Sequence, residues 1–99
     1  MRIGVFDSGL GGLTVLRKLV NKYPNNDYVY FGDTLNLPYG NKNKEELFRL
    51  ACNDIEFLLK CNVDMIIIAC GTVSSNCLEH IKNKYPVPIY DIITPTINY

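Results

Sequence analysis

The strongest constraint on the fold is a continuous apolar run, Met65-Ile66-Ile67-Ile68-Ala69. The run is rich in β-branched residues and shows no polar alternation, as expected of a central strand buried on both faces of a parallel sheet. Short apolar runs alternate along the chain with segments of helical period, which is typical of βαβ units. The sequence therefore predicts an α/β domain built on a parallel sheet.

The other elements follow from the same alternation. We expect strands over residues 3–6, 28–31, 65–69 and 89–92, and helices over 13–23, 44–59 and from Val73 to about Tyr85. Asn43 is a fair N-cap for the long helix, with Glu46 three residues on. The apolar stripe of that helix comprises Leu47, Leu50, Ala51, Ile55, Leu58 and Leu59. Right-handed crossovers favour a three-layer α/β/α fold with a four-stranded parallel sheet in the flavodoxin-like order 2-1-3-4.

Ligands of open α/β sheets bind beyond the carboxyl ends of the strands, at the point where the strand order reverses. In the order 2-1-3-4 this point lies between the first and third strands. The loops that meet there are Asp7–Gly12 and Cys70–Thr72. We therefore look for chemistry in these two loops.

Composition excludes several classes of protein. The 99 residues, 47% of them hydrophobic, suffice for one domain with a core, and ten basic residues balance ten acidic ones, so no net field attracts nucleic acid or anionic lipid. The N-terminus does not resemble a signal peptide, and no apolar stretch approaches the roughly 20 residues that span a bilayer. We expect a soluble, cytoplasmic protein. The four cysteines form no C-x-x-C pair, so neither disulfides nor a zinc site is expected.

Cys70 is the first candidate for chemistry. It follows the apolar strand and precedes a helix, whose positive end favours a thiolate that can act as nucleophile or base. The alternative is a buried structural cysteine. We expect only packing roles for the other three cysteines, Cys52, Cys61 and Cys77.

The other two candidates are loops. Asp7-Ser8-Gly9-Leu10-Gly11-Gly12 resembles an anion-binding turn, although Thr14 stands where a dinucleotide motif has its third glycine. Pro38-Tyr39-Gly40 follows the second strand and either closes over a small ligand or is an ordinary Pro/Gly loop. His80 lies within the third helix, where we expect a solvated side chain.

Together these loops resemble the N-terminal half of glutamate racemase, a member of the aspartate/glutamate racemase family. The matching segments are Ile3–Val15, Tyr30–Thr34 with Pro38–Gly40, and Ala69–Thr72, and the resemblance covers essentially the whole chain in order. It implies an isomerase that interconverts L- and D-glutamate without a cofactor and supplies D-glutamate for peptidoglycan.

The resemblance also implies a mechanism with two cysteines on opposite faces of the substrate Cα. Cys70 matches the cysteine that works on the D-glutamate side, and Asp7 matches an acid that assists it. Substrate-binding positions of the family match Asp7, Ser8, Pro38, Tyr39, Gly40, Gly71 and Thr72. The Cα–H group of glutamate is a very weak acid. A dry, preorganised site with a cysteine whose protonation can be tuned suits the removal of its proton.

Two departures from the family are evident. Gly71 stands where the family usually has an asparagine that contacts substrate. The second cysteine, with its partner acid and histidine, belongs to a second half that is not in these 99 residues. We therefore expect residues 1–99 to be an N-terminal catalytic domain without its second domain and C-terminal completion. Such a piece should be inactive alone and should expose apolar surface that favours dimers.

Two other functions are alternatives to the racemase. A cysteine-nucleophile hydrolase needs a histidine near Cys70, and His80 is the sole histidine. A nucleotide- or flavin-binding flavodoxin-like module predicts phosphate at the Gly9–Gly12 turn and an ordinary thiol at Cys70.

Overall fold

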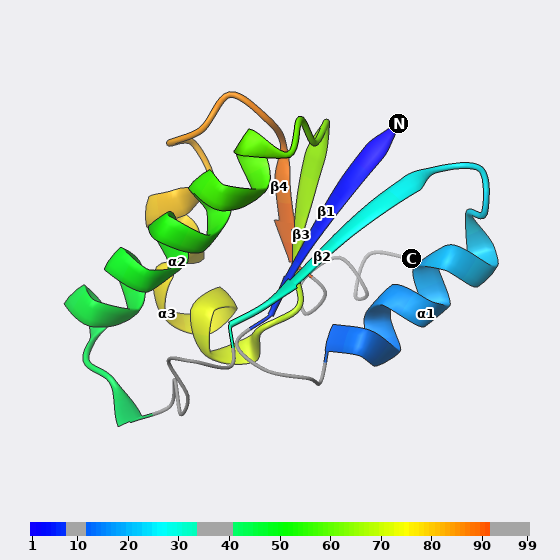
Figure 1. The fold of residues 1–99 in the computed structure, drawn as a ribbon. Coiled ribbons are helices and arrows are strands. Elements are labelled where there is room, and N and C mark those ends of the chain that lie inside the picture. Colours follow the sequence, from blue (N-terminus) through cyan, green and yellow to red (C-terminus); the bar gives the residue numbers. More distant parts are fainter. Residues whose placement is uncertain (8–11, 34–40, 92–99) are drawn as a thin grey trace.

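A computed structural model describes residues 1–7, 12–33 and 41–91 of the chain. Within them a parallel sheet contains four strands: β1 (Arg2–Asp7), β2 (Asp27–Gly32), β3 (Met65–Ile68) and β4 (Ile89–Asp91). Their order is β2-β1-β3-β4, which confirms the predicted topology. Helix α1 (Gly12–Lys22) lies on one side of the sheet, and α2 (Lys44–Lys60) and α3 (Gly71–Ile81) lie on the other (Figure 1). The predicted three-layer α/β/α arrangement is therefore confirmed.

The register assigns alternate residues of β1 to the two faces. Gly4 pairs with Val29 and Ile66, and Phe6 pairs with Phe31 and Ile68. These residues face α2 and α3, since a Cβ on Gly4 would lie 3.2 Å from Val63 and 3.4 Å from Leu58. Ile3, Val5 and Asp7 therefore face α1. The main core lies on the α2 and α3 side, where Phe6, Ile55, Leu58, Ile66 and Ile68 are fully buried.

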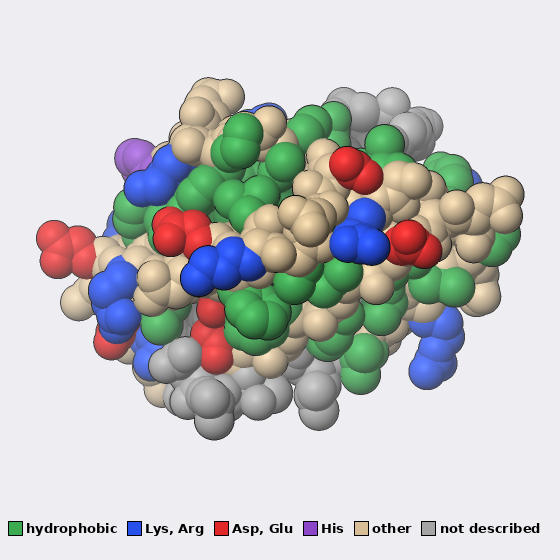
Figure 2. Space-filling view, turned by 45° about the horizontal axis from the view of Figure 1, so that its top comes forward, with side chains coloured by type: hydrophobic (Ala, Val, Ile, Leu, Met, Phe, Trp, Pro, Cys, Tyr) green, Lys and Arg blue, Asp and Glu red, His purple; other side chains and the backbone are tan. Residues whose placement is uncertain are grey.

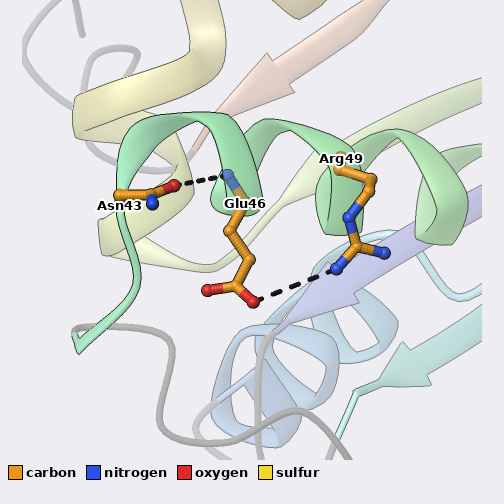
Figure 3. Close-up of polar contacts among 3 residues, drawn as sticks. All are labelled: Asn43, Glu46 and Arg49. Atoms are coloured by element: carbon orange, nitrogen blue, oxygen red, sulfur yellow. Dashed lines mark hydrogen bonds and ion pairs between the residues drawn. The ribbon is translucent and has the colours of Figure 1, made fainter.

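Helix α2 forms as its sequence predicts. Asn43 is the N-cap, and its side-chain oxygen accepts a hydrogen bond of 2.8 Å from the backbone N–H of Glu46 (Figure 3). Glu46 also lies 4.0 Å from the guanidinium of Arg49 on the exposed side of the first turns. The predicted stripe is buried except for Leu59, which is half-buried against the same core.

Helix α3 differs from its predicted bounds. It begins at Gly71, two residues earlier than expected, because the helix takes Cys70 as its N-cap. It ends at Ile81 instead of near Tyr85, and a turn with an N–H···O bond from Lys84 to Ile81 follows. The reason for the early end is Pro86, which disfavours helical backbone at Tyr85 and clashes with a helical carbonyl four residues before it.

Strand β3 is less evenly buried than predicted. Ile66 and Ile68, which face α2 and α3, are fully buried, whereas Met65 and Ile67 on the α1 side are half-buried. Tyr90, which pairs with Ile67 on the same face, is 48% exposed. Helix α1 packs on β1 and β2, so it does not cover this part of the sheet.

Charged groups are dispersed over the surface. On the face drawn in Figure 2, acidic and basic side chains alternate with apolar ones and form no large patch of one sign. None of the described helices is long and apolar enough to cross a membrane.

Candidate functional site

The described part of the candidate site lies at the carboxyl ends of β1 and β3, the two central strands. Phe6 pairs with Ile68, and the backbone N–H of Ala69 donates to the carbonyl of Phe6 at 2.8 Å. Asp7 therefore lies level with Ala69 on the neighbouring strand, and Cys70 is one residue further on. Adjacent strands are about 4.8 Å apart, so the backbones of Asp7 and Cys70 lie at the ends of neighbouring strands, with the Cys70 side chain in the core on the α2 and α3 side.

Cys70 is held between strand and helix. It is the N-cap of α3 in extended conformation, with φ −89° and ψ 115°, and its carbonyl accepts the N–H of Ser74 at 3.0 Å. Its side chain makes no capping hydrogen bond, so the sulfur is not used to satisfy the helix end. The residue is 3% exposed. A thiolate at this position would meet the positive end of α3 in a site shielded from water.

Asp7 ends β1 and is 6% exposed. Its carbonyl accepts the N–H of Asp33 at 2.9 Å, which ties the end of β1 to the end of β2. Its carboxylate also acts on Tyr30, whose pKa is raised by burial and further by the negative charge of Asp7. The Asp7 side chain is thus buried at the carboxyl edge of the sheet, near Tyr30.

The structure places Gly71 and Thr72 in the first turn of α3, directly after Cys70. Gly71 is exposed and Thr72 is half-buried, and the Thr72 carbonyl accepts the side-chain amide of Asn76 at 2.7 Å. The other predicted substrate-binding residues, Ser8, Pro38, Tyr39 and Gly40, lie outside the described residues. The Gly9–Gly11 part of the turn after β1 lies outside them too.

The remaining cysteines have the packing roles expected of them. Cys52 and Cys77 are buried and Cys61 is half-buried, and all four cysteines are free thiols. Burial raises the pKa of the Cys77 thiol, with Cys52 and Cys70 adding to the effect, so Cys77 stays protonated at neutral pH. Among the described residues, no three His, Cys, Asp or Glu side chains are grouped to hold a metal ion.

His80 is too far away to activate Cys70. It is exposed, ten residues along α3, and its ring packs edge-on against Phe48 with 6.2 Å between centroids. Ten residues of α-helix correspond to about 15 Å. The histidine required by a cysteine hydrolase is therefore not at the described site.

Two further carboxylates lie at strand ends and were not among the candidate residues predicted from the sequence. Asp33 directly follows β2 and Asp91 ends β4, and both are buried. The signal in the sequence was an acidic residue at the end of an apolar run, the same signal that singled out Asp7. Among the described residues, a shallow pocket of about 490 Å³ at the start of α2 is lined by Asn43, Glu45, Glu46 and Arg49, but neither Cys70 nor Asp7 lines it.

The chain is similar to known glutamate racemases. No family model matches the chain. It is 47% identical over 93 residues to the glutamate racemase of Fusobacterium nucleatum and 43% identical over 97 residues to that of Aquifex aeolicus. These matches cover 93% and 98% of this chain, but the chain spans only 35% and 38% of the length of the two relatives.

The fold gives the same result. The solved structure of glutamate racemase from Aquifex pyrophilus matches 99% of this chain with a TM-score of 0.94 and 43% identity, over 39% of that structure. The resemblance expected from the sequence is therefore confirmed in both sequence and fold. The chain is homologous to glutamate racemases over nearly its whole length.

Proposed function

We propose that this chain is the Cys70-bearing domain of a cofactor-independent glutamate racemase. The observation that supports it most strongly is the buried pair of Asp7 and Cys70 at the central strand ends, in a chain homologous to glutamate racemases along nearly its whole length. The relatives are almost three times as long as this chain, so we assign the rest of the site to a second domain.

Cys70 acts as a base in the proposed reaction. Its thiolate takes the α-proton of glutamate and becomes a thiol, and the electron pair of the broken C–H bond passes into the substrate carboxylate. A second thiol on the opposite face then returns a proton to Cα and becomes a thiolate. One proton is taken and one is given, so no oxidant, reductant or cofactor is needed.

Asp7 assists the base from the next strand. As a carboxylate it accepts a hydrogen bond from the ammonium group of the substrate, or it orients the proton that is exchanged at Cys70. Thr72 and the amide of Gly71 hold a substrate carboxylate at the positive end of α3, together with Ser8, Pro38, Tyr39 and Gly40. A half-site of this kind does not racemise glutamate alone, because it cannot protonate the opposite face.

Racemisation by the full-length protein tests the assignment. We expect conversion of D- to L-glutamate without added cofactor, and a loss of at least about 10²-fold in kcat on Cys70→Ala, since a general base typically contributes 10²–10⁴-fold. Cys61→Ala is the matched control, because Cys61 is a half-buried thiol at the other end of the sheet and should be replaced without loss of kcat.

Two results would contradict the assignment: an inactive wild-type protein, or a Cys70→Ala variant that retains wild-type turnover.

We also propose that the protein acts in the cytoplasm as a homodimer. The exposed apolar side chains Leu13, Val20 and Tyr23 support a contact between copies, and light scattering of the full-length protein measures the assembly.

A further inference from the structure

A tyrosine of β2 shares the α1 face of the sheet with Asp7. Val5 pairs with Tyr30 and Asp7 pairs with Gly32, so Tyr30 and Asp7 point to the same face from neighbouring strands. Gly32 has no side chain opposite Asp7. Counting back from the carboxyl edge of β2, Tyr30 is therefore the first side chain on this face.

The register places the two side chains within reach of each other. Diagonal neighbours on adjacent strands are about 7–8 Å apart, a distance that an aromatic side chain spans. Because Asp7 pairs with a glycine, no side chain from that position separates its carboxylate from the phenol ring.

Burial and charge suit a hydrogen bond from phenol to carboxylate. Asp7 is 6% exposed, and a buried carboxylate needs donors to remain charged. Burial and the charge of Asp7 both raise the pKa of Tyr30, so the phenol keeps its proton and remains a donor throughout the neutral range. The effect of Asp7 on Tyr30 also agrees with the proximity that the register implies.

We propose that Tyr30 is a positioning residue for the reaction: its hydroxyl donates a hydrogen bond to the Asp7 carboxylate and holds it against the Cys70 end of the sheet. This role rests on the proposed function, since Asp7 matters to turnover only if Cys70 exchanges a proton. Tyr30 acts through Asp7 and does not itself touch the substrate.

Tyr28 provides a matched control on the same strand and face. It pairs with Ile3, two residues further from the carboxyl edge. Its hydroxyl donates to the backbone carbonyls of Tyr23 at 2.8 Å and Leu19 at 3.1 Å, so it serves the packing of α1. Tyr28→Phe removes a hydroxyl from the same kind of environment without affecting Asp7.

The test is a double-mutant cycle in the full-length protein, with kcat and KM measured for Tyr30→Phe, Asp7→Asn, the double variant and Tyr28→Phe. We expect Tyr30→Phe to lower kcat about tenfold, as for loss of one hydrogen bond to a charged group, with KM within about twofold of wild type. In the Asp7→Asn background the same change should have no further effect, since coupled residues are not additive. Tyr28→Phe should retain the wild-type kcat.

The outcomes separate this role from the racemase assignment. An active wild-type protein in which Tyr30→Phe leaves kcat unchanged, or lowers it equally in both backgrounds, overturns the positioning role alone. A wild-type protein that does not racemise glutamate overturns the proposed function, and the positioning role with it.

Discussion

At the scale of single residues, the site depends on where a strand ends and on what lies opposite it. The positions of Cys70 and Asp7 at strand ends were predictable from the sequence, because each follows an apolar run and the carboxyl ends of central strands meet in this fold. The relation between Tyr30 and Asp7 was not, since it depends on the pairing of Asp7 with Gly32. A slip of one residue in that register would turn Tyr30 to the other face of the sheet.

The titration of Tyr30 tests this pairing without reference to activity. Because the charge of Asp7 is the second cause of the raised pKa, after burial, Asp7→Asn should lower the pKa of Tyr30 while leaving it above the ordinary value of about 10. The measurement is ¹³C NMR of ring-labelled tyrosines in the full-length protein.

Tyr85 is the internal control for that titration. Its pKa is also raised, by burial and by its contacts with Cys52 and Glu56, neither of which involves Asp7. Its resonance should show the same pH dependence in the wild-type protein and in Asp7→Asn. A Tyr30 pKa that is the same with and without the Asp7 charge would show that the two side chains do not meet.

At the scale of elements, local signals predicted the helices better at their starts than at their ends. The cap at Asn43 was predicted from the residue types alone, because its side chain bonds the N–H of Glu46 within the same turn. The start of α3 was misplaced because Cys70 caps the helix through its backbone, without a side-chain hydrogen bond that a sequence motif would reveal. The partial exposure of Met65 and Ile67 depends on the position of α1, which no local pattern specifies.

Removing the cap of α2 measures how much this local signal contributes. Asn43→Ala should lower the free energy of unfolding by about 1 kcal/mol, since the N–H of Glu46 loses its partner. Chemical denaturation of the full-length protein provides the measurement. Asn53→Ala, at an exposed position in the middle of the same helix, should be neutral or slightly stabilising, because alanine has the higher helix propensity. Equal losses in the two variants would contradict the capping role.

At the scale of the whole molecule, the sheet order β2-β1-β3-β4 makes β1 and β3 neighbours, so their carboxyl ends lie side by side. This was predictable because right-handed crossovers leave few arrangements for such a chain. The conformations of Ser8 and of the Pro38–Gly40 loop were not, since no strand or helix pattern fixes them. The relatives are much longer than this chain, and we assign to their additional length the second thiol, which exchanges a proton with the opposite face of the substrate Cα.

The partition of deuterium between substrate and product tests that central claim most directly. Full-length protein is incubated with L-glutamate in D₂O, and the reaction is stopped before a tenth of the substrate is converted. Chiral separation and mass spectrometry then measure deuterium at Cα in each enantiomer. Two monoprotic thiols on opposite faces predict D-glutamate that is almost fully deuterated and L-glutamate that is almost free of deuterium. With Cys70→Ala no D-glutamate should form. D-glutamate that retains the original proton, or deuterium that enters L-glutamate faster than D-glutamate forms, would contradict the two-thiol account.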